Sequence, residues 1–309
     1  MTRLAVTDQV MLDFATEVGE TGSVAVEGGR TRWNLGGQPR ADTRLLRAPT
    51  GVVEYVPDEM TVRVRCGTTV EELHSVLAEK RQRTALPERG GTVGGALAVG
   101  ENSLHMLGRG RVREAALQVR YVSDDAKVVT GGGPTVKNVT GFDLPRLMVG
   151  SLGTLGLMAE VILRTNPIPA VTRWLRSESI DPFQVNEIVL RPSAVLWDGT
   201  STWIELEGHG PAVDAEQARL AAVGEVRQVD GPPDLPEHRW SLPPKSTLKE
   251  FAASQTEPWV ASVGVGTVWA SVAAPAVVVD PAVAALSGRV KEQFDRNHRL
   301  NPGRTPGAR

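Results

Sequence analysis

The sequence has only one cysteine, Cys66, among its 309 residues. A single thiol cannot form an intramolecular disulfide, and it cannot supply the several thiolates that an iron–sulfur cluster or a structural zinc site requires. The sequence therefore excludes a disulfide, an iron–sulfur cluster and a multi-cysteine zinc site held by this chain alone. Cys66 follows a run of alternating apolar residues and is expected to be a small, half-buried strand residue.

The sequence also lacks an excess of charge and a long apolar run. Lys and Arg number 34 against 36 Asp and Glu, so the net charge of -2 does not favour nucleic-acid binding. No stretch approaches the roughly 18 apolar residues of a membrane span, and the acidic N-terminal region does not fit a signal peptide. We expect a cytoplasmic protein, with attachment to the inner face of a membrane through partner proteins as the alternative.

Histidine is scarce as well. The five histidines, at positions 74, 105, 209, 238 and 298, are isolated in the sequence. No two of them have the spacing at which a helix presents a pair of metal ligands, so no metal site is expected. The sequence assigns no catalytic residue.

Glycine, in contrast, is abundant, and much of it lies in three loops of the N-terminal half. These loops are VEGGRTRWNLGG (26–37), GGTVGGALAVG (90–100) and GSLGTLG (150–156). Each adjoins a predicted strand or helix, where clustered backbone N–H groups can bind an anion. None has the spacing of a Rossmann or P-loop phosphate motif, so the sequence excludes those two kinds of site.

The N-terminal half is predicted to mix helices and strands. Val10, Met11, Phe14 and Val18 share one face of a helix, for which Thr7 is the candidate cap. The segment 61–67 alternates as a strand does, with Val62 and Val64 on one face and arginines on the other. A second helix follows within 68–80, where Thr69 and Glu72 have the spacing of a capping box.

Residues 131–169, GGGPTVKNVTGFDLPRLMVGSLGTLGLMAEVILRTNPIP, resemble the core FAD motif of the vanillyl-alcohol oxidase family, also called PCMH-type flavoproteins. The resemblance is strongest to the FAD-binding E subunits of bacterial glycolate oxidases, whose hallmark is K-N-V-x-G-[YF]-D-L followed by G-S-x-G-x-L-G. GGRTRW resembles the first diphosphate loop of these subunits, and VKEQFDRNHRLNPGR (290–304) resembles their closing helix and Asn-Pro-Gly segment. The resemblance implies an α+β fold, in which a PCMH-type FAD-binding domain of two α/β subdomains precedes a small ferredoxin-like α+β cap domain.

The same resemblance implies where FAD would contact the chain. Asn301 is expected on the flavin side of the site, with a simple turn asparagine as the alternative. No histidine or cysteine stands in an obvious position for covalent attachment, so the FAD is expected to be noncovalent. The implied diphosphate contacts are Gly28, Gly29, Arg30, Thr31, Thr92, Val93, Gly94 and Gly95; those near the flavin are Gly150, Ser151, Gly153, Thr154 and Gly156, with Lys137, Asn138, Gly141 and Asp143 shaping the same wall.

The character of the sequence changes after Pro167 and Pro169. We expect an FAD-binding domain over 1–169 and a cap domain over 170–280, with a C-terminal helix and Asn-Pro-Gly segment over 281–309 returning to the flavin domain. The cap begins with the order strand, helix, strand, strand, helix, strand, which is typical of ferredoxin-like domains.

In function, the resemblance implies an FAD-dependent oxidoreductase that serves in electron transfer as one subunit of a glycolate oxidase-like 2-hydroxy acid dehydrogenase complex. The expected partners are a larger FAD-containing catalytic subunit and an iron–sulfur subunit, with a small 2-hydroxy acid as the substrate of the complex. The chain lacks the G-D-G-N-x-H type of metal motif that catalytic relatives carry in a larger cap. Two alternatives stay open: a self-sufficient small flavin oxidoreductase, in which His105 or an arginine serves the substrate, and a non-enzymatic scaffold.

Overall fold

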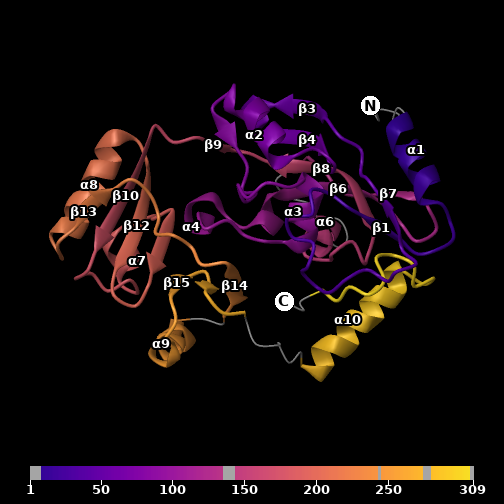
Figure 1. Cartoon of the computed structure of the whole chain (residues 1–309). Coiled ribbons are helices and arrows are strands. Elements are labelled where there is room, and N and C mark those ends of the chain that lie inside the picture. Colours follow the sequence, from indigo (N-terminus) through magenta and orange to yellow (C-terminus); the bar gives the residue numbers. More distant parts are fainter. Residues whose placement is uncertain (1–7, 135–142, 243–244, 274–279, 307–309) are drawn as a thin grey trace. The chain divides into compact units, whose positions relative to one another are not determined.

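The computed structural model describes residues 8–134, 143–242, 245–273 and 280–306. It divides into two compact units (Figure 1). The first unit comprises Met1–Ser103, Arg111–Pro167 and Val277–Arg309, and the second comprises Leu104–Gly110 and Ile168–Ala276. The inclusion of the short segment Leu104–Gly110 in the second unit is a feature that no sequence pattern predicted.

The first unit contains all three glycine loops and is built on a five-stranded antiparallel sheet with the strand order β3-β4-β8-β6-β7. Two small two-stranded sheets, β1-β2 and β5-β9, accompany it. The elements of this unit are α1 (Gln9–Val18), β1 (Val24–Val26), β2 (Arg44–Leu46), β3 (Val52–Val56), the 3-10 helix η1 (Pro57–Glu59), β4 (Thr61–Arg65), α2 (Val70–Ala78), β5 (Gln82–Arg83), α3 (Val93–Val99), α5 (Val112–Ala115), β6 (Ala116–Val122), β7 (Val128–Gly132), α6 (Leu144–Met148), β8 (Leu157–Arg164), β9 (Asn166–Pro167) and α10 (Pro281–Phe294).

The helix starts follow from local capping. The Thr69 side chain accepts the backbone N–H of Glu72 at 3.0 Å, which confirms the predicted start of α2. Asp8, rather than Thr7, caps α1 by accepting the N–H of Val10, and Thr7 lies outside the described residues. The predicted apolar face of α1 is buried except at Val10. Val10 is 42% exposed because it lies at the edge of this apolar face.

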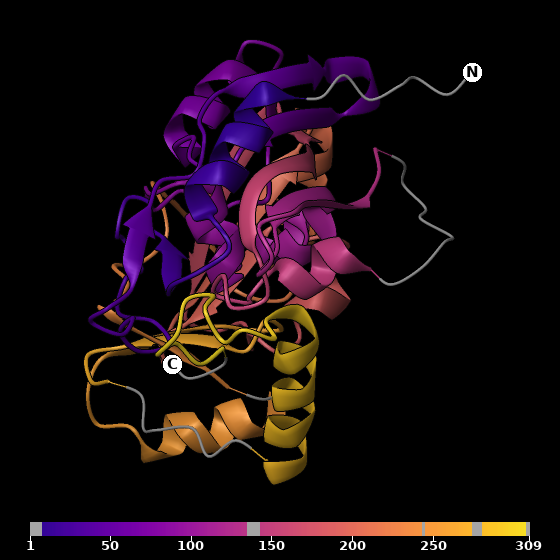
Figure 2. The ribbon, with the colours of Figure 1, turned by 90° about the vertical axis from the view of Figure 1, so that its right-hand side faces the viewer.

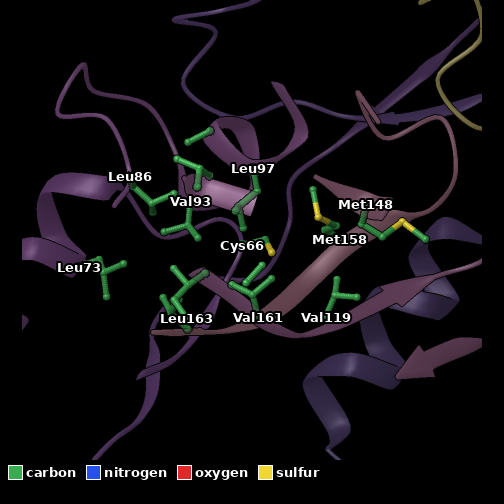
Figure 3. Packing of buried hydrophobic residues seen from close by; sticks show 14 of the residues in the cluster. Cys66, Leu73, Leu86, Val93, Leu97, Val119, Met148, Met158, Val161 and Leu163 are labelled. Atoms are coloured by element: carbon green, nitrogen blue, oxygen red, sulfur yellow. The ribbon is translucent and has the colours of Figure 1, made fainter. Parts of the chain in front are cut away.

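The main core of the first unit lies between the large sheet and helices α2 and α3. Val62 and Val64 are buried in it, as the alternation of 61–67 predicts. Cys66, directly after β4, is fully buried rather than half-buried, and its N–H donates to the carbonyl of Ala159 at 2.9 Å. Figure 3 shows this packing from close by, with labels on Cys66, Leu73, Leu86, Val93, Leu97, Val119, Met148, Met158, Val161 and Leu163.

The other face of β4 carries arginines that join a partly buried ionic network. Arg65 binds Asp8 at 2.9 Å, and Arg120 binds Glu160 at 3.1 Å. Burial opposes ionisation of Asp8, but hydrogen bonds to Arg65 and Arg120 and their positive charges outweigh it and lower the pKa of Asp8. The network joins the start of α1 to strands β4, β6 and β8.

The C-terminal segment after α10 returns to the first strand of the unit (Figure 2). Leu300 forms a parallel bridge with Val24. The Arg299 guanidinium donates to five backbone carbonyls, four of them between Val18 and Gly22 and the fifth at Asp124. The buried Asp295 carboxylate accepts the N–H groups of Arg299 and Leu300 at 3.0 Å each. These contacts hold the end of the chain against its beginning.

The second unit is a seven-stranded antiparallel sheet in the order β13-β10-β12-β11-β15-β16-β14. Its first four strands and helices α7 and α8 have the predicted ferredoxin-like chain order, and β15, β16 and β14 extend the sheet beyond it. The elements are α4 (Met106–Arg109), β10 (Val171–Ser177), α7 (Val185–Ile188), β11 (Ala194–Trp197), β12 (Thr202–Gly208), α8 (Gly210–Ala221), β13 (Arg227–Val229), β14 (His238–Ser241), α9 (Lys245–Ser254), β15 (Trp259–Ser262) and β16 (Thr267–Ala270). None of the helices in the described part of either unit has the length and apolar character needed to span a bilayer.

Candidate functional site

Two adjoining clefts lie among the glycine loops of the first unit, with volumes of about 490 Å³ and 470 Å³. All three loops contribute to them, and so does the C-terminal segment. The residues that line both clefts are Val26, Gly28, Thr92, Gly95, Ala98, Leu152 and Asn301. Segments far apart in the sequence therefore converge on one site.

Glycine is required where the first two loops meet. A Cβ at Gly28 would collide with the Thr92 hydroxyl, and a Cβ at Gly29 would lie 3.0 Å from the Cα of Gly91. Side chains at these positions would force the two loops apart. The glycines thus let two backbones approach closely, and they leave main-chain groups at the surface of the cleft.

The first loop offers a run of backbone donors. Within the described residues, the N–H groups of residues 28–32 donate no hydrogen bond to another protein group. Arg30 has a φ of 55°, so the loop turns through the left-handed region at its centre. Successive N–H groups in a turn of this kind form a concavity that favours an anion.

Buried side chains of the cleft also lack partners. Arg32 Nη2, Arg304 Nε, Arg304 Nη2 and the Oδ1 atom of Asn301 are buried, and none has a hydrogen-bond partner among the described residues. Buried donors are nearly always paired in folded proteins, so unpaired ones at the wall of a cleft indicate where a ligand binds. The orphaned arginine nitrogens call for an acceptor, and a negatively charged one fits best.

The two arginines are held in place by other contacts. Arg32 Nε donates to Glu101 at 2.5 Å, and Arg304 Nη1 donates to the carbonyl of Leu35 at 2.7 Å. The Arg304 guanidinium also lies over the ring of Trp33, 4.4 Å from its centroid. Burial lowers the pKa of Arg304, and an anion bound beside it would restore the stability of its charged form.

Asn301 ties the third loop to the C-terminal segment. Its Nδ2 donates to the carbonyl of Leu152 at 2.5 Å, and its backbone N–H donates to Val24 at 2.8 Å. Leu152 and Gly153 both adopt positive φ angles, 53° and 71°, which turn the loop at the cleft wall. A hydrogen bond between Thr154 and Ser151 stabilises this turn: Thr154 Oγ1 donates to the Ser151 carbonyl at 2.7 Å.

The structure brings only some of the predicted contact residues to the clefts. Those that line them are Gly28, Gly29, Arg30, Thr31, Thr92, Gly94, Gly95, Gly153 and Asn301. Gly150, Ser151 and Thr154 belong to the third loop but do not line the clefts, and Val93 is packed in the main core. Lys137, Asn138 and Gly141 lie outside the described residues.

Two further predicted contacts have structural explanations of their own. A Cβ at Gly156 would collide with the ring of Tyr121, so the core requires this glycine. Asp143 caps α6 by accepting the N–H of Arg146 at 3.2 Å, and it is exposed. Neither residue lines the clefts.

Sequence reasoning missed Arg32, Trp33 and Arg304 as parts of the site. A signal was present, since Arg32 and Trp33 belong to the quoted GGRTRW and Arg304 directly follows the Asn-Pro-Gly segment. Only the fold shows that these side chains meet in one cleft and that two of them have buried nitrogens without partners.

Comparison with known proteins identifies this part of the chain. Residues 11–132 match the model of a protein family described as "FAD binding domain". Residues 11–132, most of which lie in the first unit, are similar to FAD binding domains. The match includes the first two glycine loops and ends before the third, and FAD is the cofactor of this kind of domain.

Named relatives agree with the assignment. Glycolate oxidase subunit GlcE of Escherichia coli (strain K12) is 31% identical over an alignment of 207 residues, and this alignment covers 64% of this chain and 59% of the relative. D-lactate dehydrogenase of Archaeoglobus fulgidus is 29% identical over 162 residues, 51% of this chain and 36% of that protein. The chain therefore spans less than two thirds of the length of either curated relative.

Among solved structures, an alkyldihydroxyacetonephosphate synthase is similar with a TM-score of 0.66. The similarity covers 96% of this chain and 74% of the synthase at 14% sequence identity. This confirms the α+β fold. The cleft residues also fit FAD, because its anionic diphosphate matches both the backbone donors of residues 28–32 and the orphaned nitrogens of Arg32 and Arg304.

Replacing Arg304 with methionine tests the contact to the diphosphate. Arg304→Met keeps an apolar stem beside Trp33 but removes the charge. We expect the Kd for FAD to rise about 10- to 100-fold, because this is the change that corresponds to the free energy of one hydrogen bond to a charged group. FAD titration of the deflavinated protein measures this change. Arg296→Met, at an exposed arginine shortly before the same segment, is the control and should leave the Kd unchanged. Equal Kd values for the two variants would remove Arg304 from the site.

Alanine at Gly153 tests the third loop. Gly153 and Gly264 both have positive φ, 71° and 82°, and a Cβ at either position would meet nothing closer than 3.7 Å. The two substitutions should therefore cost a similar amount of stability, about 1 kcal/mol for an L-residue in the left-handed region. Only Gly153→Ala should reduce the FAD content per chain, because Gly153 lines the cleft and Gly264 lies in the other unit. FAD loss in both variants, or in neither, contradicts a flavin contact at this loop.

Proposed function

We propose that the chain is the FAD-binding subunit of a glycolate oxidase-like complex that oxidises small 2-hydroxy acids. The observation that carries this proposal is the single site at which two glycine loops, the turn at Gly153 and the orphaned arginines converge. The first two loops and Arg32 lie within the residues that match an FAD binding domain. Two of the named relatives, a glycolate oxidase subunit and a D-lactate dehydrogenase, support the 2-hydroxy acid class of substrate.

In this proposal each part of the cleft has a task. The backbone N–H groups of residues 28–32 and the guanidinium groups of Arg32 and Arg304 hold the diphosphate. The turn at Leu152 and Gly153, fixed by Asn301, forms the wall beside the flavin. When bound, FAD supplies the acceptor for the electrons of the substrate, and the protein supplies binding, orientation and electrostatics.

The proposed FAD is noncovalent. Cys66 is the only cysteine of the chain and it lines one of the clefts, so it is the residue to consider for a thioether link. Burial, together with the negative charge of Glu160, raises the pKa of the Cys66 thiol. A thiol that is held protonated is a poor nucleophile, so attachment to a flavin is disfavoured.

The proposed partners are a larger FAD-containing catalytic subunit and an iron–sulfur subunit. The relative named as a glycolate oxidase subunit supports a multi-subunit context. With a single cysteine, this chain has no thiolate set for a cluster of its own, so onward electron transfer calls for a second protein. Attachment of the complex to the inner face of a membrane through these partners belongs to the same proposal.

One observation favours a second candidate function, a self-sufficient small flavin oxidoreductase. In the second unit, His105 Nδ1 lies 2.5 Å from Glu205 Oε2. A histidine oriented by a carboxylate is the usual arrangement of a general base, which a lone 2-hydroxy acid dehydrogenase requires.

An activity comparison separates the two candidates. The purified chain, loaded with FAD, is assayed for dye-linked oxidation of glycolate and D-lactate, alone and after co-expression with a larger flavoprotein and an iron–sulfur protein from the same source. We expect negligible turnover by the lone chain and clear turnover by the complex. Rapid turnover by the lone chain, lost in His105→Ala, would replace the subunit assignment with the self-sufficient enzyme.

A further inference from the structure

The second unit gathers three side chains that can ligate a metal ion. They are His105, which precedes α4, and Glu205 and Glu207 on β12. Each offers one ligand atom, and these atoms all lie within 4.8 Å of one another. All three residues belong to the second unit, and none of them lines the clefts of the first unit.

The strand geometry explains why the two carboxylates meet. Residues two apart on a strand share one face, so Glu205 and Glu207 lie on the side of the sheet opposite Ile204 and Leu206. That side also carries buried apolar and aromatic residues, including Trp174 and Trp203. A buried carboxylate among them needs a compensating partner, and His105 contacts Glu205 directly.

The cluster is shielded from solvent. The side chains of His105, Glu205 and Glu207 are 16%, 2% and 11% exposed. His105 Nδ1 and Glu205 Oε2 lie 2.5 Å apart, so the imidazole and the carboxylate contact each other directly. Glu207 is oriented by Ser193 Oγ, which donates to it at 2.8 Å, and by Arg109, whose Nη2 lies 3.6 Å away.

We propose that His105, Glu205 and Glu207 form a binding site for one divalent transition-metal ion. One imidazole nitrogen and two carboxylate oxygens form a mixed ligand set of the kind that suits Zn²⁺ or Mn²⁺. Three protein ligands leave a further coordination position for water. Ser193 and Arg109 hold Glu207 from outside the set, as residues around a metal site commonly do.

Calorimetric titration with Zn²⁺, repeated with Mn²⁺, tests the proposal on the full FAD-loaded chain. The wild type should bind one ion per chain. His105→Ala and Glu207→Gln should weaken binding about tenfold or more, as the loss of a ligand requires. Zn²⁺ should also raise the unfolding temperature of the wild type and not that of either variant.

His209→Ala is the matched control, because His209 is exposed in the same unit and its side chain does not cap α8. This variant should bind the ion as the wild type does. FAD content should be equal in all the proteins, which shows that the first unit is folded in each. Failure of the wild type to bind either ion would overturn the proposal, and so would binding that is unaffected by His105→Ala or lost equally in His209→Ala.

Discussion

The geometry of the FAD site depends on Asn301 and the hydrogen bonds that it makes to two other parts of the chain. Its side chain donates to the carbonyl of Leu152, and its backbone donates to Val24, directly before the first glycine loop. One residue near the C-terminus therefore joins the third glycine loop to the strand that leads into the first glycine loop. The adjoining Arg304 adds a cation to the same cleft.

The position of Asn301 is itself secured by buried charge. Arg299 satisfies five carbonyls at the end of α1 and near β7, and Asp295 accepts two N–H groups of the returning segment while pairing with Lys291. Breaking such a network would leave several buried polar groups without partners, each at a cost of about 1–3 kcal/mol. The end of the chain is thus both a structural part of the first unit and a wall of its binding site.

Local patterns made much of the fold predictable from the sequence. The cap at Thr69, the alternation at Val62 and Val64, and the ferredoxin-like order of the second unit depend on residues close together in the chain, and the structure confirms them. The site was less predictable. A glycine in the sequence indicates that a side chain would not fit at that position, but it does not identify the group that lies next to it. At Gly156 the space is filled by Tyr121 in the core, whereas Gly153 faces a cleft. His105 and Glu205, 100 residues apart, meet only in the folded chain.

A crystal structure of the chain loaded with FAD tests the central claim most directly. The account predicts that the diphosphate accepts hydrogen bonds from the backbone of residues 28–32 and from the orphaned nitrogens of Arg32 or Arg304, with the flavin beside Gly153 and Asn301. A bound FAD whose diphosphate lies away from both arginines and from the first glycine loop would contradict it.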